Sequence, residues 1–159
     1  MSGVCRTVAG LGIVALLPIG VAGRQEGGKR FHLALSGENE FNAAGAPINP
    51  HGDADRGTMT LSINPGREEV CWAVEEIELT AGDALPHAAH IHSAPEGVAG
   101  PVVIDLFGAE APTEYPTGSH CVAASRDLLL DILKEPEAYY VNLHNAQHPG
   151  GVMREQLSR

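Results

Sequence analysis

Positive charge is scarce in this chain. It has 10 lysines and arginines against 20 aspartates and glutamates in 159 residues, which gives a formal net charge of −10 with the histidines neutral. Nucleic acids and anionic membrane surfaces are polyanions, so an acidic chain without a basic run has no electrostatic attraction to either. We therefore expect no nucleic-acid partner and no membrane association of the mature form.

Aromatic residues are also few, at 4% of the chain, whereas glycine (19) and proline (11) are plentiful. This composition favours short strands joined by turns over a bundle of long helices. The length suffices for one domain with a hydrophobic core, and no internal repeat or second domain is visible. We expect that domain to cover residues 31–157.

Long hydrophobic runs are absent except near the N-terminus, where the run from Val8 to Leu17 is too short and interrupted for a good membrane span. Arg6 precedes the run and the small residues Val21-Ala22-Gly23 follow it. This order predicts a cleaved signal peptide over residues 1–23, with a retained anchor as the alternative. A disordered polar leader is expected over residues 24–30, and the mature protein is expected to be secreted or periplasmic.

Cysteine is rare as well, with three in the chain. Removal of the signal peptide would take away Cys5 and leave Cys71 and Cys121, an even pair in an oxidising compartment. We predict a disulfide between them, and two buried thiols are the alternative. The closed loop of about 50 residues would stabilise the fold by roughly 4 kcal/mol in the chain-entropy model.

Alternating apolar residues and intervening turn residues predict a β-rich domain. Strands are expected near residues 31–35, 58–63, 69–77, 89–92, 102–106, 121–123, 138–144 and 152–157. The only good helix signal begins with Ser125 as N-cap and ends near Lys134, with Leu128, Leu129, Ile132 and Leu133 at helical spacing. In the loop before the second strand, Asp53-Ala54-Asp55 is interpreted as a solvated turn, because no glutamate follows at calcium-loop spacing.

The chemistry of the domain centres on Ala89-His90-Ile91-His92. Side chains alternate between the faces of a strand, so His90 and His92 share one face. By the same rule Tyr140, Asn142 and His144 share one face of a later strand, and we expect His144 to pack beside the histidine pair.

Several motifs occur in an order that resembles the chordin-type (CHRD) domain. They are His90-Ile91-His92, residues 97–106, residues 139–144 with Pro136, Pro149-Gly150 and Arg154-Glu155-Gln156-Leu157. The front half resembles the bacterial secreted branch of that family through residues 36–40, residues 52–57 and Val70-Cys71-Trp72. The resemblance spans roughly residues 31–157.

The resemblance implies an all-β fold, an antiparallel Greek-key β-sandwich similar in outline to immunoglobulin-like and copper/zinc superoxide dismutase sandwiches, with one short helix. It does not imply a catalytic activity. In animals the family occurs in an extracellular regulator of growth-factor signalling, but a shared fold is weak evidence for a shared function.

Three functions remain open. The first is a secreted, non-enzymatic module for an unknown protein or surface partner, without a cofactor, in which the histidines form a structural network with Tyr140 and Asn142. The second is a copper- or zinc-binding protein with His90, His92 and His144 as ligands, closed by His87 or His148, and with Asp105 orienting an imidazole.

An enzyme is the third and weakest interpretation. A copper redox site of the dismutase kind would need a cation to guide an anionic substrate, and Arg154 is the only one near these motifs. There is no Gly-x-Ser-x-Gly sequence that would indicate a hydrolase. No catalytic residue is therefore predicted.

Overall fold

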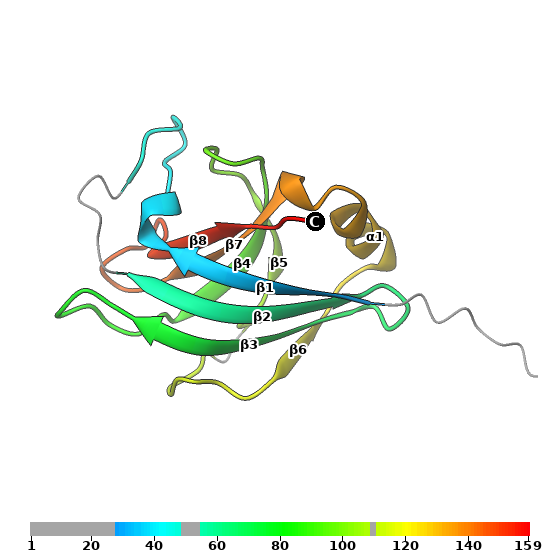
Figure 1. Ribbon diagram of the computed structural model, residues 1–159, viewed down its shortest axis with the longest axis horizontal. Coiled ribbons are helices and arrows are strands. Elements are labelled where there is room, and N and C mark those ends of the chain that lie inside the picture. The colour runs from blue at the N-terminus through cyan, green and yellow to red at the C-terminus, as the bar shows by residue number, and fades with distance from the viewer. Residues whose placement is uncertain (1–27, 49–54, 109–110) are drawn as a thin grey trace, which may run out of the picture.

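The computed structural model describes residues 28–48, 55–108 and 111–159 (Figure 1). The strands are β1 (Lys29–Ser36), β2 (Arg56–Asn64), β3 (Glu69–Glu78), β4 (Ala88–Ser93), β5 (Val102–Asp105), β6 (His120–Ala123), β7 (Tyr139–His144) and β8 (Met153–Gln156). The helices are η1 (Gly37–Asn39) and η2 (Pro136–Ala138), both 3₁₀, and α1 (Arg126–Lys134). Every strand expected from the sequence is present, with ends that differ by no more than two residues.

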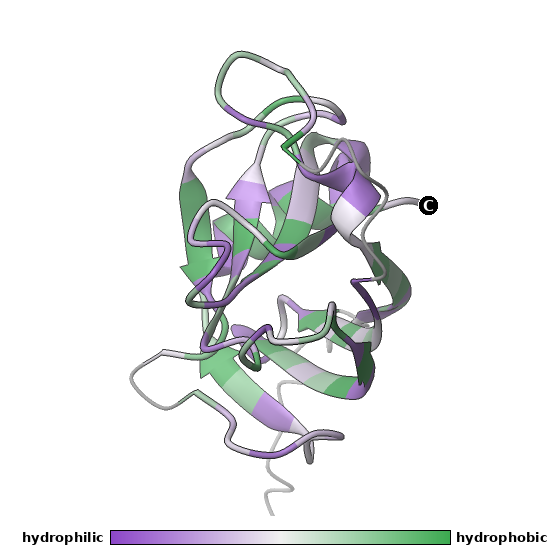
Figure 2. Ribbon diagram, turned by 90° about the vertical axis from the view of Figure 1, so that its left-hand side faces the viewer, coloured by the Kyte–Doolittle hydropathy of each residue, from purple (hydrophilic) through white to green (hydrophobic). Residues whose placement is uncertain are grey.

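The strands hydrogen-bond in the order β5-β4-β7-β8-β1-β2-β3-β6, and each neighbouring pair is antiparallel. The order divides into two halves of four strands, because β8 and β1 pair only at Ser36 and Arg154. Figure 2 shows the halves as two layers that face each other. The predicted all-β antiparallel sandwich is therefore confirmed.

The hydrophobic core lies between the two layers. Alternate residues of β1 and β2 are at most 5% exposed, as the period-two pattern predicts. They are Phe31, Leu33, Leu35, Met59, Leu61 and Ile63. Ile91, Val141 and Leu143 meet them from the other layer and are fully buried. Each such side chain contributes about 1.5–3 kcal/mol by leaving water.

The helix α1 lies at one end of the sandwich, close to the C-terminus (Figure 1). Leu129 and Ile132 are fully buried, and Leu128 and Leu133 pack partly against the core, as their spacing predicts. Ser125 occupies the N-cap position, but its side chain makes no capping hydrogen bond. Burial of the apolar stripe therefore stabilises this helix more than its cap does.

A disulfide joins Cys71 and Cys121, as predicted. The two cysteines lie directly opposite each other in the antiparallel pair of β3 and β6, with their Cα atoms 4.0 Å apart. The short strand β6 has no other neighbouring strand in the described part of the chain. The disulfide thus fixes an edge strand that four residues of main-chain pairing alone would hold weakly.

All six residues of β7 are buried, which is unusual for a strand with alternating polarity. Tyr139, Val141 and Leu143 belong to the core cluster between the layers. Tyr140, Asn142 and His144 alternate with them and therefore occupy the opposite face of the strand. A polar face that is nevertheless buried must be covered by other parts of the chain.

Two expectations about the chain before β2 are wrong. Asp55 is not in a solvated turn: it is fully buried, and its carboxylate Oδ1 accepts a hydrogen bond of 2.6 Å from the Thr80 N–H. Lys29 and Arg30 are not part of a disordered leader, because they pair in β1 with Ile63 and Ser62 of β2. Pairing with the long strand β2 extends β1 by two residues toward the N-terminus, beyond the start that the apolar pattern predicts.

Some predictions lie outside the described residues. These are the signal peptide over residues 1–23, most of the leader, and Asp53 with Ala54. Among the helices that the structure describes, none is long and apolar enough to cross a membrane.

Candidate functional site

The register between β4 and β7 assembles a polar face on the outside of the sandwich. His90 lies opposite Asn142 and His92 lies opposite Tyr140, and opposed residues of an antiparallel pair share a face. The loop after β4 folds over this face, where the Gly100 N–H donates to the Tyr140 hydroxyl at 3.1 Å. The loop therefore shields side chains that the strands alone would expose.

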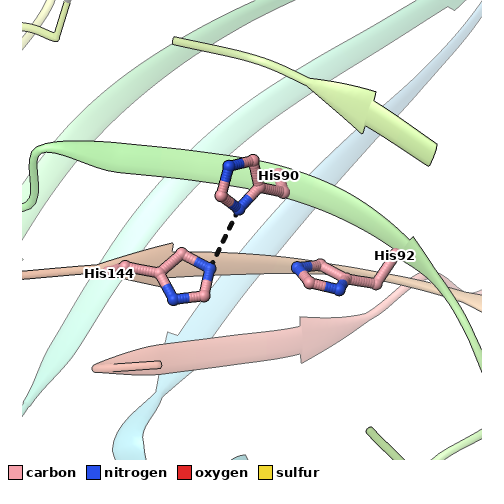
Figure 3. Close-up of side chains that lie close together, drawn as sticks. All are labelled: His90, His92 and His144. Atoms are coloured by element: carbon pink, nitrogen blue, oxygen red, sulfur yellow. Dashed lines mark hydrogen bonds between the residues drawn. The ribbon is translucent and has the colours of Figure 1, made fainter. Parts of the chain in front are cut away.

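Three histidines meet on this face, two from β4 and one from β7 (Figure 3). His90 Nδ1 and His144 Nε2 are 3.0 Å apart. One ring nitrogen from each of His90, His92 and His144 lies within 4.8 Å of those of the other two. We call these three residues the trihistidine cluster.

Backbone carbonyls hold two of the rings from behind. His92 Nδ1 lies 2.9 Å from the Gly100 carbonyl oxygen, and His144 Nδ1 lies 3.2 Å from the Pro149 carbonyl oxygen. A carbonyl oxygen only accepts, so each of these Nδ1 atoms carries the hydrogen and leaves a lone pair on Nε2 in the neutral ring. His90 Nδ1–H then donates to His144 Nε2.

The second ring nitrogen of His92 is the most unusual atom of the cluster. His92 is 8% exposed, and its Nε2 is buried without a hydrogen-bond partner among the described residues. Buried polar atoms normally have a partner, and one that lacks it costs about 1–3 kcal/mol. A ligand that accepts the lone pair of this nitrogen would remove that cost.

The surroundings keep the imidazoles neutral. Burial lowers the pKa of His90 and of His92; the Asp105 carboxylate opposes this for His90, and the Gly100 carbonyl opposes it for His92. Burial, and then the charges of His90 and His92, lower the pKa of His144 to about 4. Neutral imidazoles are the form in which histidine binds metals.

Aromatic and cationic groups extend the face beyond the cluster. The His92 ring stacks on Tyr140, with ring centroids 4.8 Å apart and planes at 9°. The Arg154 guanidinium carbon lies 3.3 Å from the centroid of the Tyr140 ring. Arg154 is only 2% exposed, and it donates to the carbonyl oxygens of Val98 at 2.9 Å and Pro95 at 3.2 Å. The arginine therefore fastens the covering loop.

A buried carboxyl group, that of Glu40, lies near this arginine, and sequence reasoning did not find it. Glu40 is 2% exposed, and its Oε2 accepts from Asn142 Nδ2 at 3.3 Å. Burial raises the pKa of Glu40 to about 8, although the Arg154 charge and the Asn142 hydrogen bond oppose the rise. Asn142 thus contacts Glu40, and the predicted bond from Asn142 to a histidine is absent among the described contacts.

Residues 31–157 match the family described as CHRD domain. The chain belongs to the CHRD domain family. The match runs from β1 to β8, so the sandwich and its polar face are parts of the same CHRD domain. No curated protein and no solved structure matches this chain.

Two other histidines were proposed as ligands, and one of them, His87, lies beside His144, whose carbonyl oxygen accepts from the His87 N–H at 2.9 Å. His87 and His148 do not belong to the trihistidine cluster. His87 is exposed where the chain enters β4, and His148 Nε2 lies 2.9 Å from Asp83 Oδ2. The turn after β7 directs His148 to another loop, which spacing along the sequence does not reveal. Asp105 Oδ1 lies 4.0 Å from His90 Nε2, on the far side of that ring from His144.

The donor set of the cluster matches borderline transition metals. Imidazole nitrogen suits copper and zinc, with metal–nitrogen distances of about 2.0–2.1 Å. Two nitrogens bound to one such ion are then separated by roughly 3.3 Å in tetrahedral geometry. The 3.0 Å between His90 Nδ1 and His144 Nε2 is close to that separation. The third nitrogen, from His92, lies within 4.8 Å of the other two, so His92 would have to move closer to reach the same ion.

Proposed function

We propose that this CHRD domain is a non-enzymatic extracellular module that binds one copper or zinc ion through His90, His92 and His144. One observation carries the proposal: His92 and His144 each have one nitrogen held by a backbone carbonyl and the other turned into the cluster. Metal-binding histidines typically have their second nitrogen fixed in this way, which sets the tautomer and the ring orientation.

Ion binding requires a change at His90. Its Nδ1 hydrogen, which points to His144, must leave if this nitrogen is to bind the ion, and the hydrogen then resides on Nε2. Asp105 supports this tautomer, because its carboxylate faces Nε2 at 4.0 Å and would attract an N–H there. In this proposal Asp105 orients the His90 imidazole.

Charge and burial favour binding over catalysis. The net charge of −10 opposes the approach of an anionic substrate such as superoxide. Arg154, the cation that lies near these motifs in the sequence, is buried and donates to the carbonyl oxygens of Val98 and Pro95. The arginine is thus used to hold the loop.

The extracellular location rests on two features. The bond between Cys71 and Cys121 is of a kind that persists in oxidising compartments, and residues 1–23 have the order of a signal peptide. We expect a protein or an envelope surface as the partner in that compartment.

A purely structural network is the second candidate, and the direct hydrogen bond between His90 and His144 favours it. In that case the cluster only ties β4 to β7. Replacing His92 by Gln would then cost no more than the roughly 1–3 kcal/mol of a lost buried partner, with no effect on any ligand.

Titration with Cu²⁺ separates the two candidates. The purified chain, stripped of metal with EDTA, is titrated beside a His90→Ala/His92→Ala variant and a His32→Ala control, since His32 is an exposed histidine of β1. We expect stoichiometric binding by the wild type and the control, with nitrogen hyperfine coupling in the electron paramagnetic resonance spectrum. We expect the coupling pattern of several bound imidazoles to be lost in the double variant. Equal, weak binding by all three proteins would leave only the structural network.

A further inference from the structure

A second cluster of metal-ligating side chains lies outside the polar face. Asp55 precedes β2, Asp83 lies between β3 and β4, and His148 lies between β7 and β8. One ligand atom from each of the three lies within 4.8 Å of the others. We propose that Asp55, Asp83 and His148 form a second metal site, for a divalent ion of the zinc class.

The strongest observation is the state of Asp55. This residue is fully buried, and while its Oδ1 accepts from the Thr80 N–H, its Oδ2 is buried without a partner among the described residues. An ionised carboxylate in such a place carries a large desolvation cost unless a positive charge compensates it. A divalent ion between Asp55 and Asp83 supplies that charge.

Hydrogen bonds within and between the β3–β4 and β7–β8 connections position the side chains of the site. Asn145 Nδ2 donates to the Ala84 carbonyl oxygen at 3.0 Å, and Asn145 Oδ1 accepts from the His148 N–H at 2.7 Å. Gln147 Oε1 accepts from the Ala84 N–H at 3.0 Å. These bonds hold Asp83 and His148 together, with Asp83 Oδ2 2.9 Å from His148 Nε2. The side chains are thus positioned before an ion arrives.

The ligand types select the class of ion. Calcium and magnesium prefer sites made only of oxygen, whereas zinc accepts carboxylate oxygen together with imidazole nitrogen. Two carboxylates and one imidazole form three protein ligands, and the two negative charges balance a divalent ion. His148 is partly exposed, with 31% of its side chain accessible, so a water molecule has access as a fourth ligand.

The second site is independent of the trihistidine cluster in its ligands but shares a loop with it. The segment between β7 and β8 contains His148 and also Pro149, whose carbonyl oxygen holds His144 Nδ1. An ion on His148 would fix this segment and with it the position of the Pro149 carbonyl group. Neither site supplies a ligand to the other.

Isothermal titration with Zn²⁺ in the His90→Ala/His92→Ala background tests the proposal, because that background removes the trihistidine cluster. We expect one ion per chain to bind to this protein. Adding Asp83→Asn or His148→Gln should abolish binding or weaken it at least tenfold. Asp127→Asn, which removes an exposed carboxylate of α1, should leave it unchanged. Circular dichroism of each metal-free variant shows whether it is folded.

The outcomes distinguish this site from the proposed function. If the double-histidine background binds no zinc while the wild type binds one ion, the second site is refuted and the trihistidine cluster stands. If zinc binding persists unchanged in both Asp83→Asn and His148→Gln, these residues are not ligands and the proposal is also refuted. Because the two variants remove different ligands, a carboxylate and an imidazole, one misfolded protein cannot decide the result.

Discussion

Replacing Glu40 by Gln should change how the stability of this domain depends on pH. The folded state keeps Glu40 protonated up to about pH 8, whereas an ordinary glutamate ionises near 4.5. Between these values the folded state binds more protons than the unfolded state, so stability falls as pH rises. Glutamine cannot ionise, and the variant should lack this fall.

The size of the effect follows from the shift in pKa. Each pH unit within the window costs at most about 1.4 kcal/mol of unfolding free energy, so the wild type should lose roughly 2 kcal/mol between pH 6.5 and 8. When Glu40 is protonated, its Oε1 can donate a hydrogen bond. Asn142 already contacts Glu40, and its Oδ1 is a buried acceptor without a partner among the described residues. A neutral side chain therefore suits this position.

The trihistidine cluster acts in the opposite direction at lower pH. The pKa of each of its histidines is lowered from 6.5, to about 4 for His144, so the unfolded state binds more protons in this window. This contribution to stability is complete above about pH 6.5 and is lost as pH falls toward 4. We expect the wild type to be most stable near pH 6.5.

Urea denaturation at several pH values between 5 and 9, in EDTA to exclude metal, measures these changes. Glu40→Gln should be more stable than the wild type by about 4 kcal/mol at pH 8, and the two should differ by less than about 1 kcal/mol at pH 5. Glu38→Gln, at an exposed neighbouring position, is the matched control and should follow the wild type. A parallel pH dependence of Glu40→Gln and wild type would refute the argument.

Two further predictions concern the disulfide and a glycine with positive φ. Replacing both Cys71 and Cys121 by Ser should lower the unfolding free energy by about 2–4 kcal/mol, because a loop with a sequence separation of 50 is no longer closed. The denatured, unreduced mature protein, from which Cys5 has been removed with residues 1–23, should show no free thiol. Gly151→Ala should destabilise the fold by more than 1 kcal/mol in thermal unfolding, because the residue has φ of +137° and the new Cβ would meet the Glu40 carboxyl group. Gly108→Ala is the control: this glycine also has positive φ, at +60°, but a new Cβ there would meet no other atom, so the variant reports a backbone cost without a collision.

Much of the site could be predicted from alternation along strands. His90 and His92 share a face because they are two residues apart, and Tyr140, Asn142 and His144 do so for the same reason. Strand position therefore indicated which side chains meet, whereas the disulfide was predicted from the even pair of cysteines that remains after residues 1–23 are removed.

The contacts that sequence reasoning missed are made by loops or depend on them. Glu40 lies just after η1 and meets Asn142, which is 102 residues away in the sequence. Asp55, Asp83 and His148 come from three different connections and converge only in the folded chain. Loops have no periodicity, so their contacts depend on the whole fold. The burial of Arg154 by the loop after β4 was unforeseen for the same reason.

The position of β8 has a consequence for folding. This four-residue strand, Met153–Gln156, is the last of the described strands, and its pairing with β1 is the link between the two layers in the strand order. Its partners β7 and β1 are far apart in sequence, since Ser36 pairs with Arg154. Contacts between residues so far apart in sequence form slowly, so the pairing of β1 with β8 is expected to be a slow step in folding. The two layers cannot pair at this junction until synthesis has passed residues Met153–Gln156, so a chain truncated before Met153 would lack the strand that joins them.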